Sequence, residues 1–476
     1  MSELSTPKID VPKEFVEHSA LERMVVKSIA YIPGMRELAS SRRMLIILRG
    51  STWTMAGYAG VQLLRFAATL VLARKLLSPQ AFGLVALVNV FLGGLDMLSD
   101  LGLGMDVVQH PRGDEPTFVN TAFLIQAGRG VVIWVIATTL AYPFAYFYHQ
   151  PAVCWLAMVG ALSVAVRGLT SGSVWLMTRH VQIGKLTALN LVSEVAGFLV
   201  SVGWAIASPT AWALVAGRVA ASVVYMLGSH LVAENRISFL WDRSAARDIF
   251  IFGTGIFLST ATYFLGGESE RLVIGKFISM AELGCFSLAL TLSTAPSRAI
   301  QQVVGQVFFP VMARSVRKDR DAAAGHFRSA RYVFLALGIV LSMGFIAYSH
   351  RIVGILLPPK YAMTAWMLQF MGFRAGLEIF AAPSSSLILA CGDSKYAAIM
   401  NTSRLVLMVG GVWFAFAKFG IYQAIVVLAF VPLIVYPIVI FGVTRHLRRT
   451  LWVELVCFAL FIAASAIAAM LPWPWA

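Results

Sequence analysis

The sequence predicts an all-α polytopic membrane protein with about 12–14 transmembrane helices, on three observations. Hydrophobic residues make up 59% of the 476-residue chain and charged residues only 13%. The mean hydropathy is +0.78. A soluble domain has about a quarter charged residues, and a soluble fold of this composition would expose large apolar patches to water. The third observation is a series of apolar runs, each long enough to cross a bilayer as a helix.

Thirteen such runs follow one another along the chain. Crossing the hydrocarbon requires about 20 residues in a helix, and every backbone N–H and C=O needs a partner within the chain. The runs are too long and too continuously apolar for barrel strands, which alternate over about ten residues. They lie near residues 52–73, 82–104, 118–147, 152–177, 186–207, 209–233, 248–267, 281–309, 329–349, 361–390, 396–417, 419–442 and 452–471.

The N-terminal segment 1–50 is polar, and we expect it to be a cytoplasmic tail and not a cleaved signal peptide. Within it, residues 21–48 place apolar positions such as Leu21 and Ile29 before Arg42. Two interpretations fit this pattern equally well: an amphipathic helix on the membrane surface and a partly disordered tail.

The basic residues predict the orientation in the membrane. A net charge of +15 would suggest nucleic acid in a soluble protein, but in a membrane protein the positive-inside rule explains it, and we expect no nucleic-acid partner. With the N-terminus in the cytoplasm, the inner connections hold sixteen Lys and Arg residues, six of them from Arg314 to Arg331, and the outer connections hold seven. The N-terminus is therefore predicted to be cytoplasmic.

A short motif occurs twice, as residues 77–83 (LSPQAFG) and 278–284 (ISMAELG), at an offset of 201. Six spans separate the copies, so both have the same orientation, as in the parallel repeats of transporters. The repeat predicts two six-helix bundles around a central cavity and one extra helix. The expected parts are a first bundle at 51–233, a cytoplasmic linker at 234–247, a second bundle at 248–444 and an extra C-terminal transmembrane helix at 445–476.

Charged residues inside the spans point to a site, because a charge in the bilayer normally faces a cavity or a partner. Six arginines and only two glutamates lie near the middle of spans, and this surplus predicts a cavity suited to an anionic cargo. A guanidinium can hold two phosphate oxygens at once and stays charged at any working pH. The candidate substrate-binding residues are Arg65, Arg129, Arg298, Arg404, Arg374 and Arg218, and the candidate coupling or gating residues are Asp96, Asp100, Glu194 and Glu378.

Local pairing is the competing interpretation for some of these residues. Arg374 and Glu378 are four residues apart on one helix and can satisfy each other, and Arg218 can pair with Glu194 on the neighbouring span. The acids at 96 and 100 also share a helix face, where they would bind a coupling cation or simply form an anionic helix end before Gly102.

Metal and redox chemistry are not expected. The four cysteines lie far apart in or beside apolar spans, which predicts free thiols. The eight histidines form no HExxH pattern, and the chain has no CxxC pair. We therefore predict no metal site and no cofactor.

Several motifs resemble those of the polysaccharide biosynthesis (O-antigen flippase) family of the multidrug/oligosaccharidyl-lipid/polysaccharide (MOP) exporter superfamily. They are residues 73–84, 98–104, 271–277, 309–314 and 390–393. The resemblance implies two six-helix bundles around a central cavity. It also implies flipping of a polyprenyl-pyrophosphate-linked oligosaccharide across the bacterial inner membrane. The family has no strict catalytic motif, so the resemblance assigns no site residue.

The leading hypothesis is therefore a flippase that works by alternating access. Its expected partners are membrane lipids, and a polysaccharide polymerase or glycosyltransferases are candidate partners. An exporter of cationic drugs is the alternative, but it needs an anionic cavity, and the charges inside these spans are mostly positive. A membrane enzyme is the third hypothesis. It is disfavoured because the outer connections are short and loops usually carry catalysis.

Overall fold

The computed structural model describes residues 57, 59–98, 101–180, 182–233, 238–447 and 450–470. The expected tail 1–50 and Asp100 lie outside the described residues. The described residues form helices joined by short connections and contain no strand, so the all-α fold class is confirmed. In this part of the chain nine helices are long and apolar enough to cross a membrane. The chain is a multi-pass membrane protein.

The helices of the first half mostly match the predicted runs. Two runs are each divided: the run at 82–104 by a turn at Gly102, whose φ is +62°, and the run at 152–177 by a turn at residues 169–172. The elements are a helix at 59–71 that continues as the π-helical turn η2 (Leu72–Leu76), then α4 (Pro79–Leu98), α5 (Leu103–Gln109), α6 (Pro116–Phe147), α7 (Pro151–Gly168), α8 (Ser173–Arg179), α9 (Ile183–Ala207) and α10 (Trp212–Leu231).

In the second half the helices that begin at residues 243 and 320 extend further than their apolar runs. Polar residues begin them, because the Asp242 and Asp319 side chains accept hydrogen bonds from backbone N–H groups two residues on. The elements are α11 (Arg243–Gly275), α12 (Met280–Val303), η3 (Val304–Phe308), α13 (Phe309–Lys318), α14 (Arg320–Leu356), η4 (Pro359–Tyr361), α15 (Met363–Ala390), α16 (Ser394–Phe419), α17 (Ile421–His446) and α18 (Leu451–Met470).

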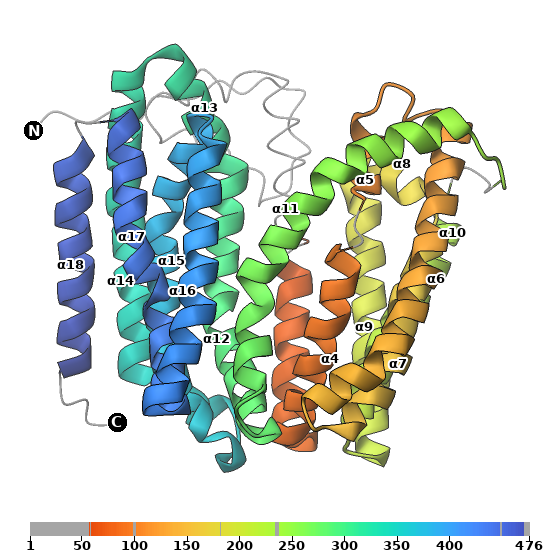
Figure 1. Cartoon of the computed structure of the whole chain (residues 1–476), viewed down its shortest axis with the longest axis horizontal. Helices are drawn as coiled ribbons and strands as arrows, with labels where there is room; N and C mark the ends of the chain where they lie inside the picture. The colour runs from red at the N-terminus through yellow and green to blue at the C-terminus, as the bar shows by residue number, and fades with distance from the viewer. Residues whose placement is uncertain are drawn as a thin grey trace, which may run out of the picture. The chain divides into compact units, whose positions relative to one another are not determined.

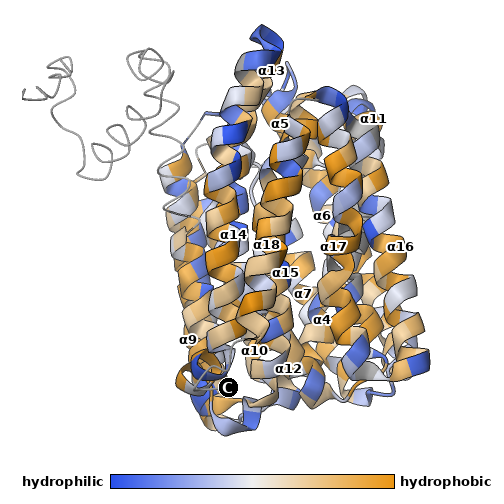
Figure 2. Ribbon diagram, turned by 90° about the vertical axis from the view of Figure 1, so that its left-hand side faces the viewer, coloured by the Kyte–Doolittle hydropathy of each residue, from blue (hydrophilic) through white to orange (hydrophobic). Residues whose placement is uncertain are grey.

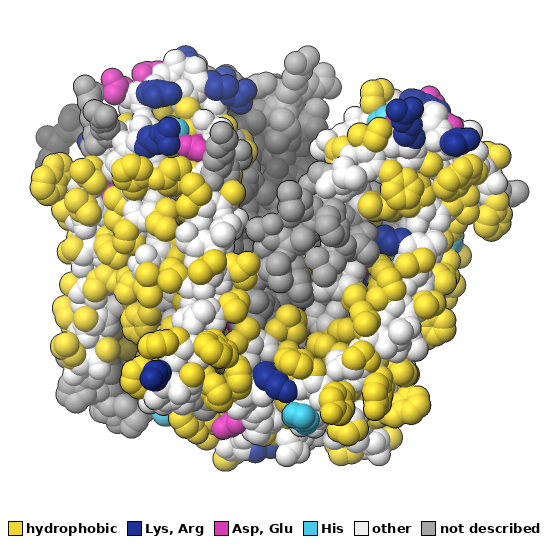
Figure 3. Space-filling model, viewed as in Figure 1, with side chains coloured by type: hydrophobic (Ala, Val, Ile, Leu, Met, Phe, Trp, Pro, Cys, Tyr) yellow, Lys and Arg dark blue, Asp and Glu magenta, His cyan; other side chains and the backbone are white. Residues whose placement is uncertain are grey.

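Within residues 59–470 the helices pack in two groups (Figure 1). In one, α7 contacts α4, α6 and α10, and α9 contacts α10; in the other, α15 contacts α12, α14 and α17, while α18 contacts α14. The long helix α11 contacts α4 and α6 of the first group and α16 of the second. Figure 2 shows hydrophobic residues along the outward sides of α16, α17 and α18, and in Figure 3 most Lys and Arg lie toward the upper and lower edges of the face. This distribution suits a bilayer around the helices.

The two copies of the repeated motif begin helices α4 and α12 in the same way. Ser78 and Ser279 lie 201 residues apart. Each hydroxyl accepts a hydrogen bond from the backbone N–H three residues on, at 3.3 Å from Ala81 and 3.2 Å from Glu282. The Glu282 carboxylate also accepts from the Ser279 backbone N–H at 2.9 Å, which completes a capping box. Equivalent residues thus start equivalent helices.

The same two helix starts pack against each other through glycine. A Cβ at Gly83 would lie 1.8 Å from the Met280 carbonyl oxygen, and a Cβ at Gly284 would lie 1.9 Å from the Pro79 carbonyl oxygen. The contact is reciprocal: each glycine meets a backbone carbonyl at the start of the other helix. Gly83 and Gly284 are 201 residues apart, and so are Pro79 and Met280. Only glycine permits this approach, and the contact joins the two groups of helices.

A buried ion pair holds the last helix. Arg331 of α14 and Glu454 of α18 are fully buried, and their side chains meet at 2.9 Å. Glu454 also accepts from the Tyr436 hydroxyl at 2.6 Å and from the Ser384 hydroxyl at 2.8 Å, and the Arg331 guanidinium lies 3.6 Å from the centre of the Phe380 ring. The placement of Arg331 in an inner connection was wrong. Arg331 already lies within the apolar run at 329–349, and in the structure it is buried inside α14.

Substituting alanine for Gly83 or Gly284 is expected to lower the melting temperature of the purified protein. The added methyl forces the backbones of α4 and α12 apart, and overpacking costs about 1–3 kcal/mol. Gly93→Ala is the control, because a Cβ at Gly93 meets nothing within 4 Å. Equal melting temperatures for all three variants, measured in detergent, would refute the role given to this contact.

Glu454→Leu is expected to destabilise the protein by about 3–5 kcal/mol, because it leaves Arg331 buried without its counter-charge. Arg331→Met should have a similar effect. The double variant should regain much of the loss, since hydrophobic replacement of a whole buried pair is often nearly neutral. Thermal unfolding of the four proteins tests this, and a double variant no more stable than either single variant would contradict it.

Candidate functional site

A cavity of about 880 Å³ lies mainly among helices of the first group. Its walls come from the helix at 59–71 and from α4, α7, α9, α10 and α12, with smaller contributions from η2, α6, α8 and α11. This volume lies in the range of ligand-binding cavities. The charged lining residues are Arg65, Asp96, Arg129, Arg167, Glu194, Arg218, Arg271 and Arg298.

The cavity brings together many of the residues singled out from the sequence. Four of the six candidate substrate-binding arginines and two of the four candidate gating acids line it. The sequence analysis missed Arg167 and Arg271. Arg167 lies inside the run at 152–177 and meets the same criterion as the others, whereas Arg271 lies near the end of α11, beyond the run at 248–267. The candidates in the lining are Arg65, Arg129, Arg218, Arg298, Asp96 and Glu194.

Two arginines of the cavity have carboxylate partners. Arg65 donates to Glu194, which joins the helix at 59–71 to α9, and their side chains are 54% and 18% exposed. Arg129 of α6 donates to the Asp96 carboxylate of α4 at 3.1 Å and to the Asp96 backbone carbonyl at 3.2 Å. Because both pairs face the cavity, an anionic ligand can compete with these carboxylates for the guanidinium groups.

Arg218 has neutral partners instead. It donates to the Asn89 side-chain oxygen at 2.5 Å and to the Ser163 hydroxyl at 3.2 Å. The alternative pairing of Arg218 with Glu194 was wrong, since Glu194 forms its ion pair with Arg65. Hydrogen bonds to neutral groups orient a guanidinium without cancelling its charge. Six arginines against two acids leave the described lining strongly positive.

The remaining candidates form a separate cluster in the second group. Arg374 donates to both carboxylate oxygens of Glu270 at 2.5 and 2.6 Å and to Glu378 at 3.1 Å. Arg404 donates to Glu378 at 2.8 Å. The residues that line the cavity do not include Glu270, Arg374, Glu378 or Arg404. The pairing of Arg374 with Glu378 is therefore present, and two arginines balance two glutamates across α11, α15 and α16.

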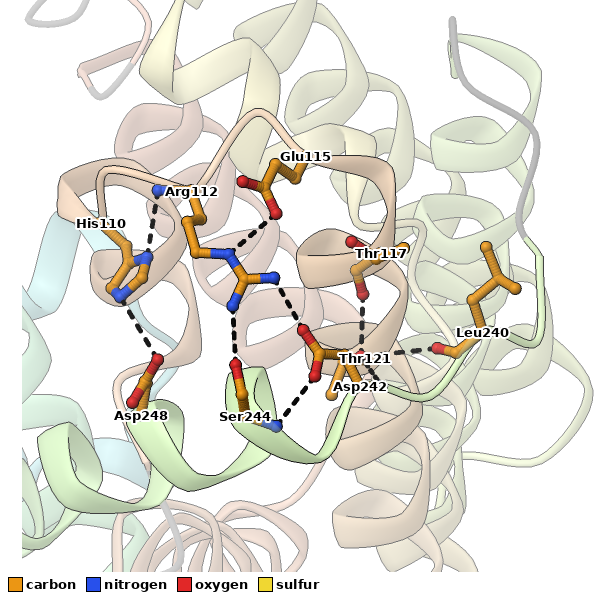
Figure 4. Close-up of polar contacts among 9 residues, drawn as sticks. All are labelled: His110, Arg112, Glu115, Thr117, Thr121, Leu240, Asp242, Ser244 and Asp248. Atoms are coloured by element: carbon orange, nitrogen blue, oxygen red, sulfur yellow. Dashed lines mark hydrogen bonds and ion pairs between the residues drawn. The ribbon is translucent and has the colours of Figure 1, made fainter.

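A polar network outside the spans ties the start of α11 to the first group (Figure 4). Arg112 donates to Glu115 and to the Ser244 hydroxyl at 2.8 Å each, and to Asp242 at 2.7 Å. The hydrogen bond from Arg112 holds the pKa of the Asp242 carboxyl below its usual range. Asp242 in turn caps α11 through the Ser244 backbone N–H at 2.8 Å. The orientation of α11 thus depends on the connection between α5 and α6.

A family model described as "Polysaccharide biosynthesis protein" matches residues 71–365, well over half of the chain. The chain belongs to this family. The teichuronic acid biosynthesis protein TuaB of Bacillus subtilis is 20% identical over 321 residues, which cover 65% of this chain and 64% of TuaB. The succinoglycan biosynthesis transport protein ExoT of Rhizobium meliloti is 21% identical over 333 residues, which cover 70% of this chain and 66% of ExoT. The chain thus spans just under two thirds of either relative.

Two solved structures share the fold of this family member. The lipid II flippase MurJ in an inward closed conformation has a TM-score of 0.65 at 10% identity, over 88% of this chain and 97% of MurJ. An inward-facing MATE multidrug resistance transporter of the MOP superfamily has a TM-score of 0.57 at 12% identity, over 94% of this chain and 98% of that one. The polysaccharide biosynthesis family inferred from the motifs is confirmed, and the fold is shared with these two transporters.

Glu194→Gln is expected to raise the affinity of the purified protein for inorganic pyrophosphate by about 2–10-fold, because it removes the carboxylate that competes for Arg65. The melting temperature should change little, since an exposed ion pair contributes about 0–1 kcal/mol. Glu115→Gln is the charge-matched control, since Glu115 pairs with Arg112 outside the cavity. Calorimetric titration measures both variants, and a weaker affinity in Glu194→Gln would contradict the prediction.

Proposed function

We propose that this protein flips a polyprenyl-pyrophosphate-linked oligosaccharide across the bacterial inner membrane for surface or extracellular polysaccharide biosynthesis. The observation that carries the proposal is the cavity of about 880 Å³ with six arginines and two acids in its lining. The names of the relatives TuaB and ExoT, in teichuronic acid and succinoglycan biosynthesis, and of the flippase MurJ support it.

In this proposal the pyrophosphate lies on Arg65, Arg129, Arg218 and Arg298. Charge-assisted hydrogen bonds to phosphate oxygens are about twice as strong as neutral ones, and they strengthen further where water is excluded. Glu194 and Asp96 pair with Arg65 and Arg129, and they would give them up when the cargo enters. Arg374 and Arg404, with their balanced partners, would stabilise the packing of the second group.

The expected orientation follows from the basic residues of the sequence, with the N-terminus in the cytoplasm. The paired N-terminal ends of α4 and α12 would then lie toward the outer face, and α8 toward the inner one. Alternating access would require the two groups of helices to turn about the contact between Gly83 and Gly284, opening the cavity to each side in turn. Membrane lipids would surround the lipid tail of the cargo, and a polymerase or glycosyltransferases would act before or after transport.

An exporter of cations is the alternative within the same superfamily. The MATE transporter that shares the fold makes this a reasonable competitor. A positive cavity repels a cationic drug, however, and attracts a pyrophosphate. The charge of the lining therefore favours the flippase and a transport role without catalysis.

Flipping in proteoliposomes tests the proposal. The probe is a polyprenyl-pyrophosphate-linked saccharide with a fluorescent group, whose exposure on the outer leaflet is followed with an impermeant quencher. Arg218→Ala and Arg298→Ala should each slow flipping about tenfold or more, because each removes a charged hydrogen-bond donor worth about 1.5–3 kcal/mol.

Arg247→Ala is the matched control, because Arg247 is exposed at the start of α11 and does not line the cavity. It should flip the probe at the wild-type rate. Wild-type protein that leaves this probe untransported but exports a cationic dye would reverse the ranking of the two functions.

A further inference from the structure

The composition of the cavity lining changes from one end to the other. Near the N-terminal ends of α10 and α12 the lining contains Leu214, Ser287 and Leu288, and Arg271 lines it near the end of α11. Toward the C-terminal ends of α7 and α10 it contains Arg167 and Tyr225, joined by Gln126 of α6 and Trp175 of α8. The second end therefore combines two aromatic rings with a guanidinium and an amide.

The side chains at this end hold one another in place. The Arg167 guanidinium lies 5.5 Å from the centre of the Tyr225 ring. The Gln126 side-chain nitrogen donates to the backbone carbonyls of Arg167 and Gly168, both at 3.3 Å, and this fixes the amide against the end of α7. Among the described residues Arg167 has no carboxylate within ion-pair distance, in contrast to Arg65 and Arg129.

Glycines make room for the indole of Trp175. A Cβ at Gly104 would lie 3.1 Å from indole Cδ1 and 3.2 Å from Nε1, and a Cβ at Gly172 would lie 3.5 Å from two atoms of the six-membered ring. The ring is thus packed against the backbone of α5 and the start of α8 while Trp175 also lines the cavity. A ring held in this way offers a flat apolar surface at little cost in conformational entropy.

This combination of groups suits a sugar. Aromatic rings pack against the apolar C–H faces of a saccharide, while amide, guanidinium, phenol and indole groups donate to or accept from its hydroxyls. A pyrophosphate needs only cations and donors and gains nothing from two aromatic rings. An apolar lipid tail gains nothing from a guanidinium and an amide.

We propose that Gln126, Arg167, Trp175 and Tyr225 form a saccharide-binding subsite, separate from the arginines that hold the pyrophosphate. The inference rests on the proposed function and deepens it. The subsite selects cargo that carries a sugar over the bare lipid pyrophosphate, and it lies at the end of the cavity next to α8, which would face the cytoplasm where the cargo enters.

Binding of two lipids to the purified full-length protein tests the subsite. The probes are undecaprenyl pyrophosphate without a sugar and undecaprenyl-pyrophosphate-linked oligosaccharide, each titrated in detergent. Trp175→Ala and Tyr225→Ala should weaken binding of the sugar-bearing lipid about tenfold and leave binding of the bare lipid within about twofold. Arg218→Ala should weaken both.

Two sets of controls keep the result interpretable. Trp155→Ala removes an indole from α7 that is 65% exposed and does not line the cavity, and it should change neither affinity. Trp175→Phe and Tyr225→Phe keep an aromatic face and should retain most of the preference for the sugar-bearing lipid. If Trp175→Ala fails to fold, Tyr225→Ala decides by the same comparison.

The outcomes separate the subsite from the function itself. Equal weakening of both lipids by Trp175→Ala and Tyr225→Ala would overturn the subsite, and so would unchanged binding of both. Wild-type protein that binds neither lipid would overturn the proposed function. A loss confined to the sugar-bearing lipid supports the subsite.

Discussion

A guanidinium keeps its proton at any working pH, so each arginine within these spans must find a counter-charge, a polar neighbour or water. The structure meets this requirement in different ways. Arg331 and Arg374 lie in closed clusters with glutamates that balance their charge. Arg65 keeps a carboxylate partner but faces a cavity, and Arg218 has only neutral hydrogen-bond partners there among the described residues. Six arginines and two acids line the cavity, so its described lining keeps a net positive charge.

This division follows the two groups of helices. The copies of the repeated motif begin α4 and α12 with equivalent serine caps and meet through equivalent glycines, so the backbone is similar where the groups join. The side chains differ. The first group contributes most of the cavity wall and most of its arginines, whereas the second packs its charges into balanced clusters. The two groups thus share a backbone arrangement where they join and differ in where their charged side chains lie.

A polar network and a glycine contact join the two groups of helices. The network of Arg112 with Asp242 and Ser244 holds the start of α11 against the first group, and α11 then crosses to contact α16 (Figures 1 and 4). The contact of Gly83 with Met280 and of Gly284 with Pro79 has no side chain between the backbones, so α4 and α12 approach each other closely there. The two groups are thus joined by the Arg112 network, by α11 and by the contact of α4 with α12.

The sequence by itself determined the fold class, the approximate spans, the repeat and the family, because apolar length and short motifs are local properties of the chain. It also identified four arginines that line the cavity. Only the tertiary structure decided the partners. Glu194 pairs with Arg65 and not with Arg218, Arg331 is buried in α14, and Glu270 joins Arg374. These ion pairs join residues more than a hundred positions apart. The arginine that a glutamate reaches depends on how the helices pack, and local sequence patterns do not contain that information.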